Sequence, residues 1–173
     1  MKTVAIILLG GSSTRFNDAT PKQFYLVNDK PLIYYTINSF EKSPLIDSIV
    51  LVANKDYKKE LDEVLEKYAF KKILHVVEGG ISRQESSLLG LFSLRKILDR
   101  DDNVLIHDGA RPLVSNEIIA NLVDALKTHN GATVALPSTD TVTLVDKENM
   151  EIVGTLNRDE VYLVETPQAF KYG

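Results

Sequence analysis

The amino-terminal stretch constrains the fold more than any other, because an unbroken aliphatic run there leads into a polar loop that begins with glycine. Residues Val4 to Leu9 are all apolar and lack the alternation of a strand with one wet face. A run of this kind is typical of a strand that a parallel sheet covers on both sides. We therefore predict a buried strand over Val4 to Leu9, ending at the edge where α/β proteins bind ligands.

The loop after this strand has the residue types of an anion-binding site. It reads Gly10-Gly11-Ser12-Ser13-Thr14-Arg15, and Pro21-Lys22-Gln23-Phe24 follows. The glycines permit a tight backbone path with outward amides, and hydroxyls and two cations lie close behind them. The loop has neither the Walker spacing nor the Gly-x-Gly-x-x-Gly fingerprint. It therefore predicts polyphosphate binding through a less common motif.

Strands and helices alternate along most of the remaining chain. We predict strands at 48–53, 73–77 and 104–107, and helices at 32–40, 57–68, 82–98 and 115–126. This order is typical of a doubly wound, mostly parallel α/β sheet with its ligands at the carboxyl ends of the strands. The tail differs, because its short β-branched segments at 132–136, 141–145, 151–155 and 161–164 predict a β-rich extension that leaves the sheet and returns.

Length and composition narrow the class of protein. A chain of 173 residues suits one domain, so we expect residues 1–173 to form a single domain. The net charge of −4 gives no global basic surface for nucleic acid. No cysteine is present, which removes disulfides and thiolate chemistry and suits a reducing compartment. The apolar run is too short to span a bilayer, so we expect a cytoplasmic protein without membrane contact.

Three motifs in this order resemble those of the cytidylyltransferases that make CDP-methylerythritol, with the ribitol-phosphate cytidylyltransferases close behind. They are the loop just described, His107-Asp108-Gly109-Ala110-Arg111-Pro112, and Thr166-Pro167-Gln168-Ala169-Phe170. The resemblance implies a Rossmann-like fold of the nucleotide-diphospho-sugar transferase type, with a β-arm at about 136–165. It also implies transfer of CMP from CTP to 2-C-methyl-D-erythritol 4-phosphate, with release of pyrophosphate, in isoprenoid precursor synthesis.

The resemblance assigns roles residue by residue. It implies that Arg15, Lys22 and Arg158 are catalytic, because fixed cations stabilise the charge that builds on a phosphate chain and its α-phosphorus. The nucleotide-binding residues it implies are Leu9, Gly10, Gly11, Ser12, Ser13, Thr14, Gly80, Ser86, Asp108 and Gly109. The residues it implies for the sugar-alcohol substrate are Asp108, Arg111, Thr141, Arg158 and Thr166.

The resemblance also implies a metal, a partner and a longer chain. Mg²⁺ is expected because a triphosphate is normally handled as its metal complex, and Asp108 is the one protein ligand we expect. A homodimer is expected through interlocking β-arms, with CTP and a small phosphorylated sugar alcohol as ligands. Members of the family continue beyond the position of Gly173. We therefore expect this chain to be a carboxyl-terminally truncated piece with weak or no activity alone.

Plainer interpretations stay open for each group. Arg15 and Lys22 fit two solvated charges, Asp108 fits a turn residue paired with Arg111, and Arg158 fits an exposed charge beside its acidic neighbours. Ribitol 5-phosphate is the alternative acceptor. A nucleotide-binding module without catalysis is the alternative of another class, and a dinucleotide oxidoreductase is disfavoured because its glycine fingerprint is missing.

Overall fold

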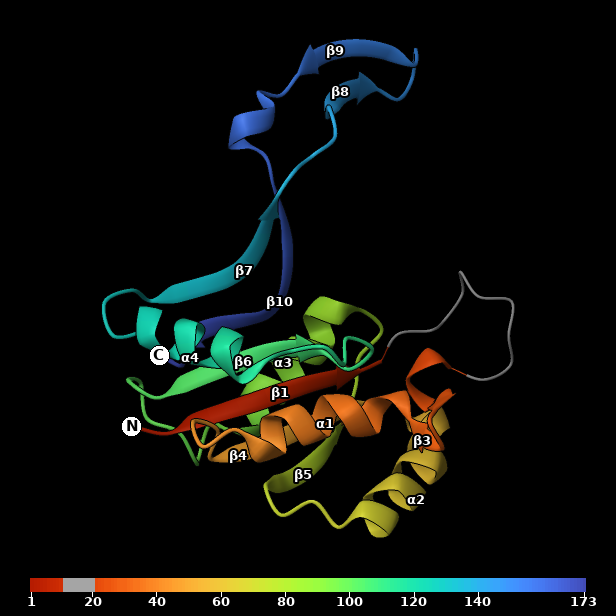
Figure 1. Cartoon of the computed structure of the whole chain (residues 1–173), viewed down its shortest axis with the longest axis vertical. Coiled ribbons are helices and arrows are strands. Elements are labelled where there is room, and N and C mark those ends of the chain that lie inside the picture. The colour runs from red at the N-terminus through yellow and green to blue at the C-terminus, as the bar shows by residue number, and fades with distance from the viewer. Residues whose placement is uncertain (11–20) are drawn as a thin grey trace.

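A six-stranded sheet forms the centre of the computed structural model, which describes residues 1–10 and 21–173 (Figure 1). Its strand order is β5-β4-β1-β6-β10-β7. The strands are β1 (Thr3–Leu9), β4 (Ser48–Ala53), β5 (Ile73–Glu78), β6 (Asn103–Asp108), β7 (Gly131–Pro137) and β10 (Tyr162–Lys171). The helices are α1 (Leu32–Lys42), α2 (Lys58–Tyr68), α3 (Arg83–Ser93) and α4 (Asn116–Ala125).

The amino-terminal run forms the central parallel strand, as predicted. β1 pairs in parallel with β4 and with β6, so that Ile6 lies opposite Val50 on one side and Ile106 on the other. All seven residues of β1 are buried. The predictions of parallel strands at 48–53, 73–77 and 104–107 are confirmed, and with them the doubly wound α/β class.

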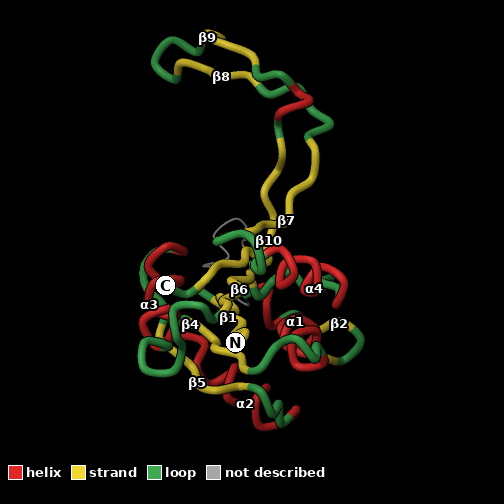
Figure 2. Tube along the Cα trace, turned by 90° about the vertical axis from the view of Figure 1, so that its left-hand side faces the viewer, coloured by secondary structure: helices red, strands yellow, loops and turns green. Residues whose placement is uncertain are grey.

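Helices cover both faces of the sheet, which explains why β1 needs no polar face. α1, α2 and α4 lie on one face, where alternate residues of β1 such as Ile7 pack beside Ile37 and Ile119. α3 lies on the other face, where Ile6 belongs to a second core together with Leu94. Figure 2 shows α3 and α4 on opposite sides of the strands. Within the described ranges, no helix combines the length and apolarity that crossing a membrane requires.

Serine side chains cap two of the predicted helices. The Ser115 hydroxyl accepts the Ile118 amide at the start of α4, and the Ser82 hydroxyl accepts the Glu85 amide at 3.0 Å at the start of α3. α3 ends earlier than predicted. Its α-helical part stops at Ser93, and the chain continues to residue 98 in tighter turns that still bury Leu94.

The predicted tail strands at 132–136, 141–145 and 151–155 are confirmed with small shifts of their ends, whereas the predicted strand at 161–164 is too short. The segment at 161–164 is the start of a ten-residue strand, β10, that runs antiparallel to both β6 and β7 and lies between them. Its pairing with β7 shifts register between Val164 and Gln168. The full length of this strand cannot be recognised in the sequence, because only the part beside β6 is buried and its hydrophobicity is therefore mixed.

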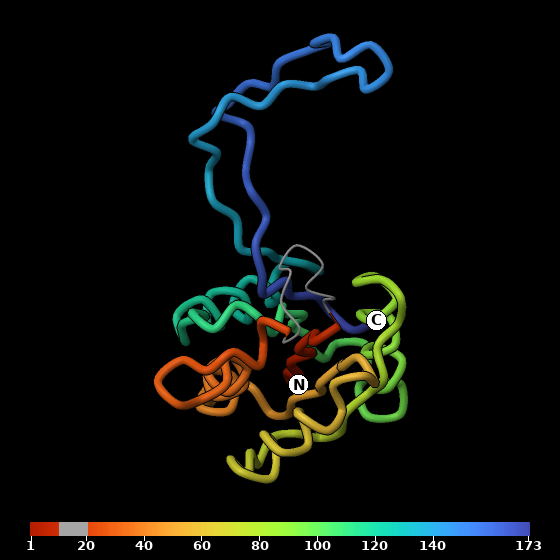
Figure 3. Tube along the Cα trace, turned by 90° about the vertical axis from the view of Figure 1, so that its right-hand side faces the viewer, coloured from red at the N-terminus to blue at the C-terminus, as the bar shows by residue number. Residues whose placement is uncertain are grey.

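The chain leaves the body of the molecule between β7 and β10. Figure 3 shows these two strands extending from the sheet and bending into the hairpin of β8 (Thr143–Asp146) and β9 (Glu151–Thr155). This arm exposes many apolar side chains. They include Leu136, Leu144, Ile152, Val153, Leu163 and Val164. A two-stranded ribbon has too little core for such residues, so the arm presents an apolar surface.

The short elements complete the fold. They are the 3₁₀ turns η1 (Lys22–Phe24), η2 (Lys55–Tyr57) and η3 (Arg158–Glu160) and the strand pair β2 (Leu26–Val27) and β3 (Lys30–Pro31).

Candidate functional site

A glycine turn and a buried serine meet at the carboxyl ends of β1 and β5. The Gly79 amide donates to the Ala53 carbonyl at 2.9 Å, which fixes the turn to the end of β4. The Ser86 hydroxyl, 3% exposed, accepts the Gly80 amide at 3.1 Å from the first turn of α3. A methyl group added to Gly10 would lie 3.5 Å from that hydroxyl. These residues therefore form one close-packed corner beside the start of α3.

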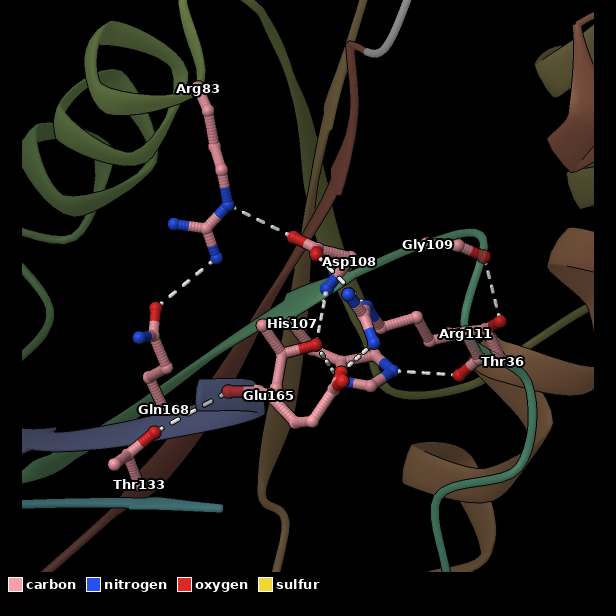
Figure 4. A network of polar contacts seen from close by, with 10 residues as sticks. Thr36, Arg83, His107, Asp108, Gly109, Arg111, Thr133, Glu165 and Gln168 are labelled. Atoms are coloured by element: carbon pink, nitrogen blue, oxygen red, sulfur yellow. Dashed lines mark hydrogen bonds and ion pairs between the residues drawn. The ribbon is translucent and has the colours of Figure 1, made fainter. Parts of the chain in front are cut away.

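An aspartate held by two guanidinium groups forms the adjacent part of the site (Figure 4). Asp108 ends β6, and its Oδ1 accepts Arg83 Nε at 3.1 Å while its Oδ2 accepts Arg111 Nε at 3.2 Å. The two arginines are about half exposed and the aspartate is 31% exposed. Solvent screens pairs of this kind, so each contributes about 0–1 kcal/mol to stability. Their main effect is to fix the positions of the two cations.

β10 supplies the third side of this network. Arg83 Nη2 donates to Gln168 Oε1 at 3.2 Å, and Arg111 Nη1 forms an ion pair with Glu165 Oε2. Figure 4 shows these side chains converging from α3, β6 and β10. The Thr133 hydroxyl on β7 donates to the Glu165 carbonyl at 3.4 Å. Three segments far apart in the sequence are thus joined at one end of the sheet.

Buried hydrogen bonds brace the turn that follows β6. The Thr36 hydroxyl, from α1, donates to the Gly109 carbonyl at 2.8 Å. A methyl group on Gly109 would overlap the Leu9 side chain and lie 3.0 Å from the Leu8 carbonyl oxygen. Gly109 therefore faces the core, and its lack of a side chain is explained by packing. His107 is buried as well, and desolvation lowers its pKa below the ordinary value.

The polar segment after the predicted loop returns to the same end of the sheet. The Gln23 side chain is 5% exposed, and its Nε2 donates to the Leu9 carbonyl at 3.1 Å. This bond holds η1, and with it Lys22, beside the end of β1. The predicted residues Gly11, Ser12, Ser13, Thr14 and Arg15 lie outside the described part of the chain.

The structure gathers most of the other predicted site residues and separates two of them. One end of the sheet brings together Leu9, Gly10, Lys22, Gly80, Ser86, Asp108, Gly109, Arg111 and Thr166. Thr141 and Arg158 are exposed on the arm, which Figure 1 shows away from that end. The pairing of Asp108 with Arg111, considered above as the plainer interpretation, is present.

The acidic residues at the site allow only a sparse set of metal ligands. Across residues 1–10 and 21–173, no three His, Cys, Asp or Glu side chains form a group suited to a metal ion. Asp108 and Glu165 lie near each other, but each already pairs with Arg111. A donor set of one or two carboxylates fits a magnesium ion that takes its other ligands from phosphate and water. It does not fit a metal bound by protein alone.

Three residues of the network have no role among the predictions from the sequence. They are Arg83, which follows the turn at Gly80, Glu165, which precedes the third motif, and Gln168, which lies within it. Their pairing depends on β10 lying beside β6, which the sequence did not predict. Among these three residues, the charge of Glu165 directly before the third motif was the signal available in the sequence.

Comparisons with known proteins show what the chain is similar to. The chain matches the family described as 2-C-methyl-D-erythritol 4-phosphate cytidylyltransferase over residues 3–173. A protein of that name from Lachnoclostridium phytofermentans is 39% identical over 171 residues, covering 99% of this chain and 71% of the relative. A ribitol-5-phosphate cytidylyltransferase from Vibrio parahaemolyticus is 38% identical over 168 residues, covering 96% and 70%.

Solved structures agree with the sequence relatives. The 4-diphosphocytidyl-2C-methyl-D-erythritol synthase from Anaerococcus prevotii matches with a TM-score of 0.80 and 33% identity, over 99% of this chain and 71% of that one. The Francisella tularensis 2-C-methyl-D-erythritol 4-phosphate cytidylyltransferase matches with a TM-score of 0.79 and 30% identity, over 100% and 74%. The chain therefore belongs to the 2-C-methyl-D-erythritol 4-phosphate cytidylyltransferase family.

Proposed function

We propose that this protein transfers CMP from CTP to 2-C-methyl-D-erythritol 4-phosphate and releases pyrophosphate. Family membership supports the reaction. The observation that carries the proposal at the level of the site is the Asp108 carboxylate held between Arg83 and Arg111 at the carboxyl end of β6. In an open α/β sheet this edge is where ligands bind, and fixed cations there suit a reaction between two phosphates.

The chemistry needs positioned charge more than covalent participation by the protein. An oxygen of the acceptor phosphate attacks the α-phosphorus of CTP, the bond from that phosphorus to the bridging oxygen breaks, and pyrophosphate leaves. We assign Lys22 and Arg15 to the triphosphate, where positive charge stabilises the pentacoordinate phosphorus. Gly80 and Ser86 are assigned to the cytosine base, because a small-residue corner allows a flat ring to approach the backbone amides.

Mg²⁺ belongs to the proposal as the partner of the triphosphate. When bound, it would neutralise phosphate charge and orient the α-phosphate for attack. Asp108 is the proposed protein ligand, and it would release one guanidinium to bind the ion. Arg83 would then keep its bond to Gln168 and remain beside the site.

The positions of Thr141 and Arg158 support a homodimer as part of the same proposal. Both residues are exposed on an arm that carries a row of exposed apolar side chains. An apolar arm of this kind is suited to burial against a second copy, which would bring Arg158 to the partner's sheet. The arm residues assigned to the acceptor would then complete the site of the other subunit.

Mixing two inactive variants tests the shared site. We expect Arg158→Ala and Asp108→Asn each to lose activity as homodimers, since one removes an arm residue and the other a sheet residue. In an equal mixture, about half of the co-refolded dimers would be mixed, and each mixed dimer would contain one intact site of its two. The mixture should therefore recover about a quarter of the wild-type activity. No recovery, in a sample that light scattering shows to be dimeric, would exclude the shared site.

Pyrophosphate release from CTP tests the reaction itself. The assay compares 2-C-methyl-D-erythritol 4-phosphate with ribitol 5-phosphate, using the longest available version of the chain, with UTP and ATP as controls for the base. Ribitol 5-phosphate is retained as a second candidate because a relative bearing that name is 38% identical. Nucleotide binding without pyrophosphate release from either acceptor would support a non-catalytic binding module instead.

The cell compartment completes the proposal. We expect the protein to act in the cytoplasm, in line with its cysteine-free sequence and its need for a nucleoside triphosphate. Fractionation of cells that express a tagged chain tests this expectation, with a cytosolic and a membrane marker run in parallel.

A further inference from the structure

His107 lies at the centre of the site although no role has been assigned to it. It is the penultimate residue of β6 and is 1% exposed, with its ring 5.1 Å from the Phe40 ring. Both ring nitrogens have partners. Nε2 lies 2.9 Å from the Arg111 carbonyl oxygen, and Nδ1 lies 3.1 Å from the Thr166 hydroxyl. The imidazole therefore connects the turn after β6 with β10.

The partners determine where the proton of this imidazole lies. A carbonyl oxygen only accepts hydrogen bonds, so Nε2 carries the proton and donates to Arg111. Desolvation lowers the pKa of His107, although its hydrogen bond to the Arg111 carbonyl and the nearby Asp108 carboxylate act in the opposite direction. A neutral ring with its proton on Nε2 leaves Nδ1 as an acceptor, and the Thr166 hydroxyl donates to it.

The hydroxyl of Thr166 is itself an acceptor within the turn. The Asp108 amide donates to Thr166 Oγ1 at 3.3 Å. The bonds therefore run in one direction, from the Asp108 amide to Thr166, from Thr166 to His107, and from His107 to the Arg111 carbonyl. These hydrogen bonds connect both ends of the turn, at Asp108 and at Arg111, to the middle of β10.

We propose that His107 is a positioning residue, which accepts a hydrogen bond from the Thr166 hydroxyl and donates one to the Arg111 carbonyl, so that the turn after β6 is held in one arrangement against β10. The inference rests on the proposed function, since Asp108, Arg111 and Thr166 are its acceptor-binding residues.

Kinetics of ring and side-chain variants test the proposal. His107→Phe keeps the ring volume and removes both bonds, and we expect kcat/KM for the acceptor to fall on the order of 10- to 100-fold. The KM for CTP should rise less than that for the acceptor, because Ser86 and Gly80, which are assigned to the base, do not contact these hydrogen bonds. His107→Asn restores a polar partner for Thr166 and should recover part of the loss. Equal losses for both substrates, or no rescue, would overturn the proposal.

A double-mutant cycle adds a readout of coupling. Thr166→Val removes the hydroxyl and Thr166→Ser retains it, so the serine variant should keep more activity than the valine variant. If His107 acts through Thr166, the combination of His107→Phe and Thr166→Val should be little worse than the more damaging single change. Fully additive losses in kcat/KM would show that the two residues act independently, which contradicts the proposal.

Nitrogen NMR of the imidazole tests the proton placement without any assay of activity. At neutral pH the wild-type protein should show a His107 ring protonated on Nε2 and unprotonated on Nδ1, as its two partners require. A ring protonated on Nδ1 would overturn the proposal. If neither acceptor supports turnover, the proposed function fails, whereas this spectrum still decides the proton placement of His107.

Discussion

Replacing Gly109 by alanine tests whether packing, and not backbone conformation, requires glycine at the turn after β6. No glycine in residues 1–10 and 21–173 has a positive φ, so alanine can adopt the backbone conformation of Gly109. Space is the only obstacle. The new methyl would overlap the end of the Leu9 side chain and would lie 3.0 Å from the Leu8 carbonyl oxygen and 3.3 Å from Ile33 Cδ1. The Leu9 side chain can rotate away, but the Leu8 carbonyl is part of the central strand.

The expected cost follows from two opposing effects. Overpacking a well-filled site costs about 1–3 kcal/mol, while alanine lowers the entropy of the unfolded chain and returns about 0.4–1 kcal/mol. We therefore expect Gly109→Ala to lower the free energy of unfolding by about 1–2 kcal/mol. Gly154→Ala is the matched control, because its methyl would meet only Leu144 Cδ1 at 3.9 Å. It should leave stability unchanged or slightly raised.

Urea denaturation followed by circular dichroism measures both variants. The midpoint of Gly109→Ala should fall while the dependence of the free energy on urea stays constant, since the surface exposed on unfolding is unchanged. A Gly109→Ala protein as stable as Gly154→Ala would refute the packing explanation. The conformation of the turn would then have to be reconsidered.

Three further outcomes follow from the same contacts. His107 is protonated near pH 6.5 in the unfolded chain and only at a lower pH in the native protein. The free energy of unfolding should therefore decrease as the pH falls below 6.5. Urea midpoints measured above and below that pH check this dependence. Ser86→Ala leaves the Gly80 amide without its acceptor and should cost about 1 kcal/mol in the same assay, together with weaker CTP binding by calorimetry. Thr36→Val removes the buried donor to the Gly109 carbonyl and should lower stability by about 1–3 kcal/mol, whereas Thr36→Ser should cost less.

The parallel half of the sheet could be predicted because its signals are local. An uninterrupted apolar run such as that of β1 occurs only where both faces are covered, and the hydroxyls of Ser82 and Ser115 mark helix starts within a few residues. α3 was predicted too long for the same reason. Leu94 and Leu98 continue its apolar pattern, and periodicity does not separate an α-helix from the tighter turns that bury them here.

The pairing of charges in the site could not be predicted, because it depends on contacts between segments distant in the sequence. Asp108 and Arg111 are neighbours in one turn, so their bond was among the expected interpretations. Arg83 reaches Asp108 only because α3 begins beside the end of β6, and Gln168 reaches Arg83 only because β10 inserts next to β6. No local pattern specifies that insertion.

The position of β10 has a consequence for how the chain acquires its structure during synthesis. β6 is buried between β1 and β10, yet its second neighbour is translated only after the whole arm has been made. Until then the edge of β6, with Val104 and Ile106, offers unpaired backbone and apolar side chains to other chains. A ribosome stalled within the arm would therefore carry a sheet with an unpaired, aggregation-prone edge strand. Chaperones that bind nascent chains should protect the chain most strongly at that stage.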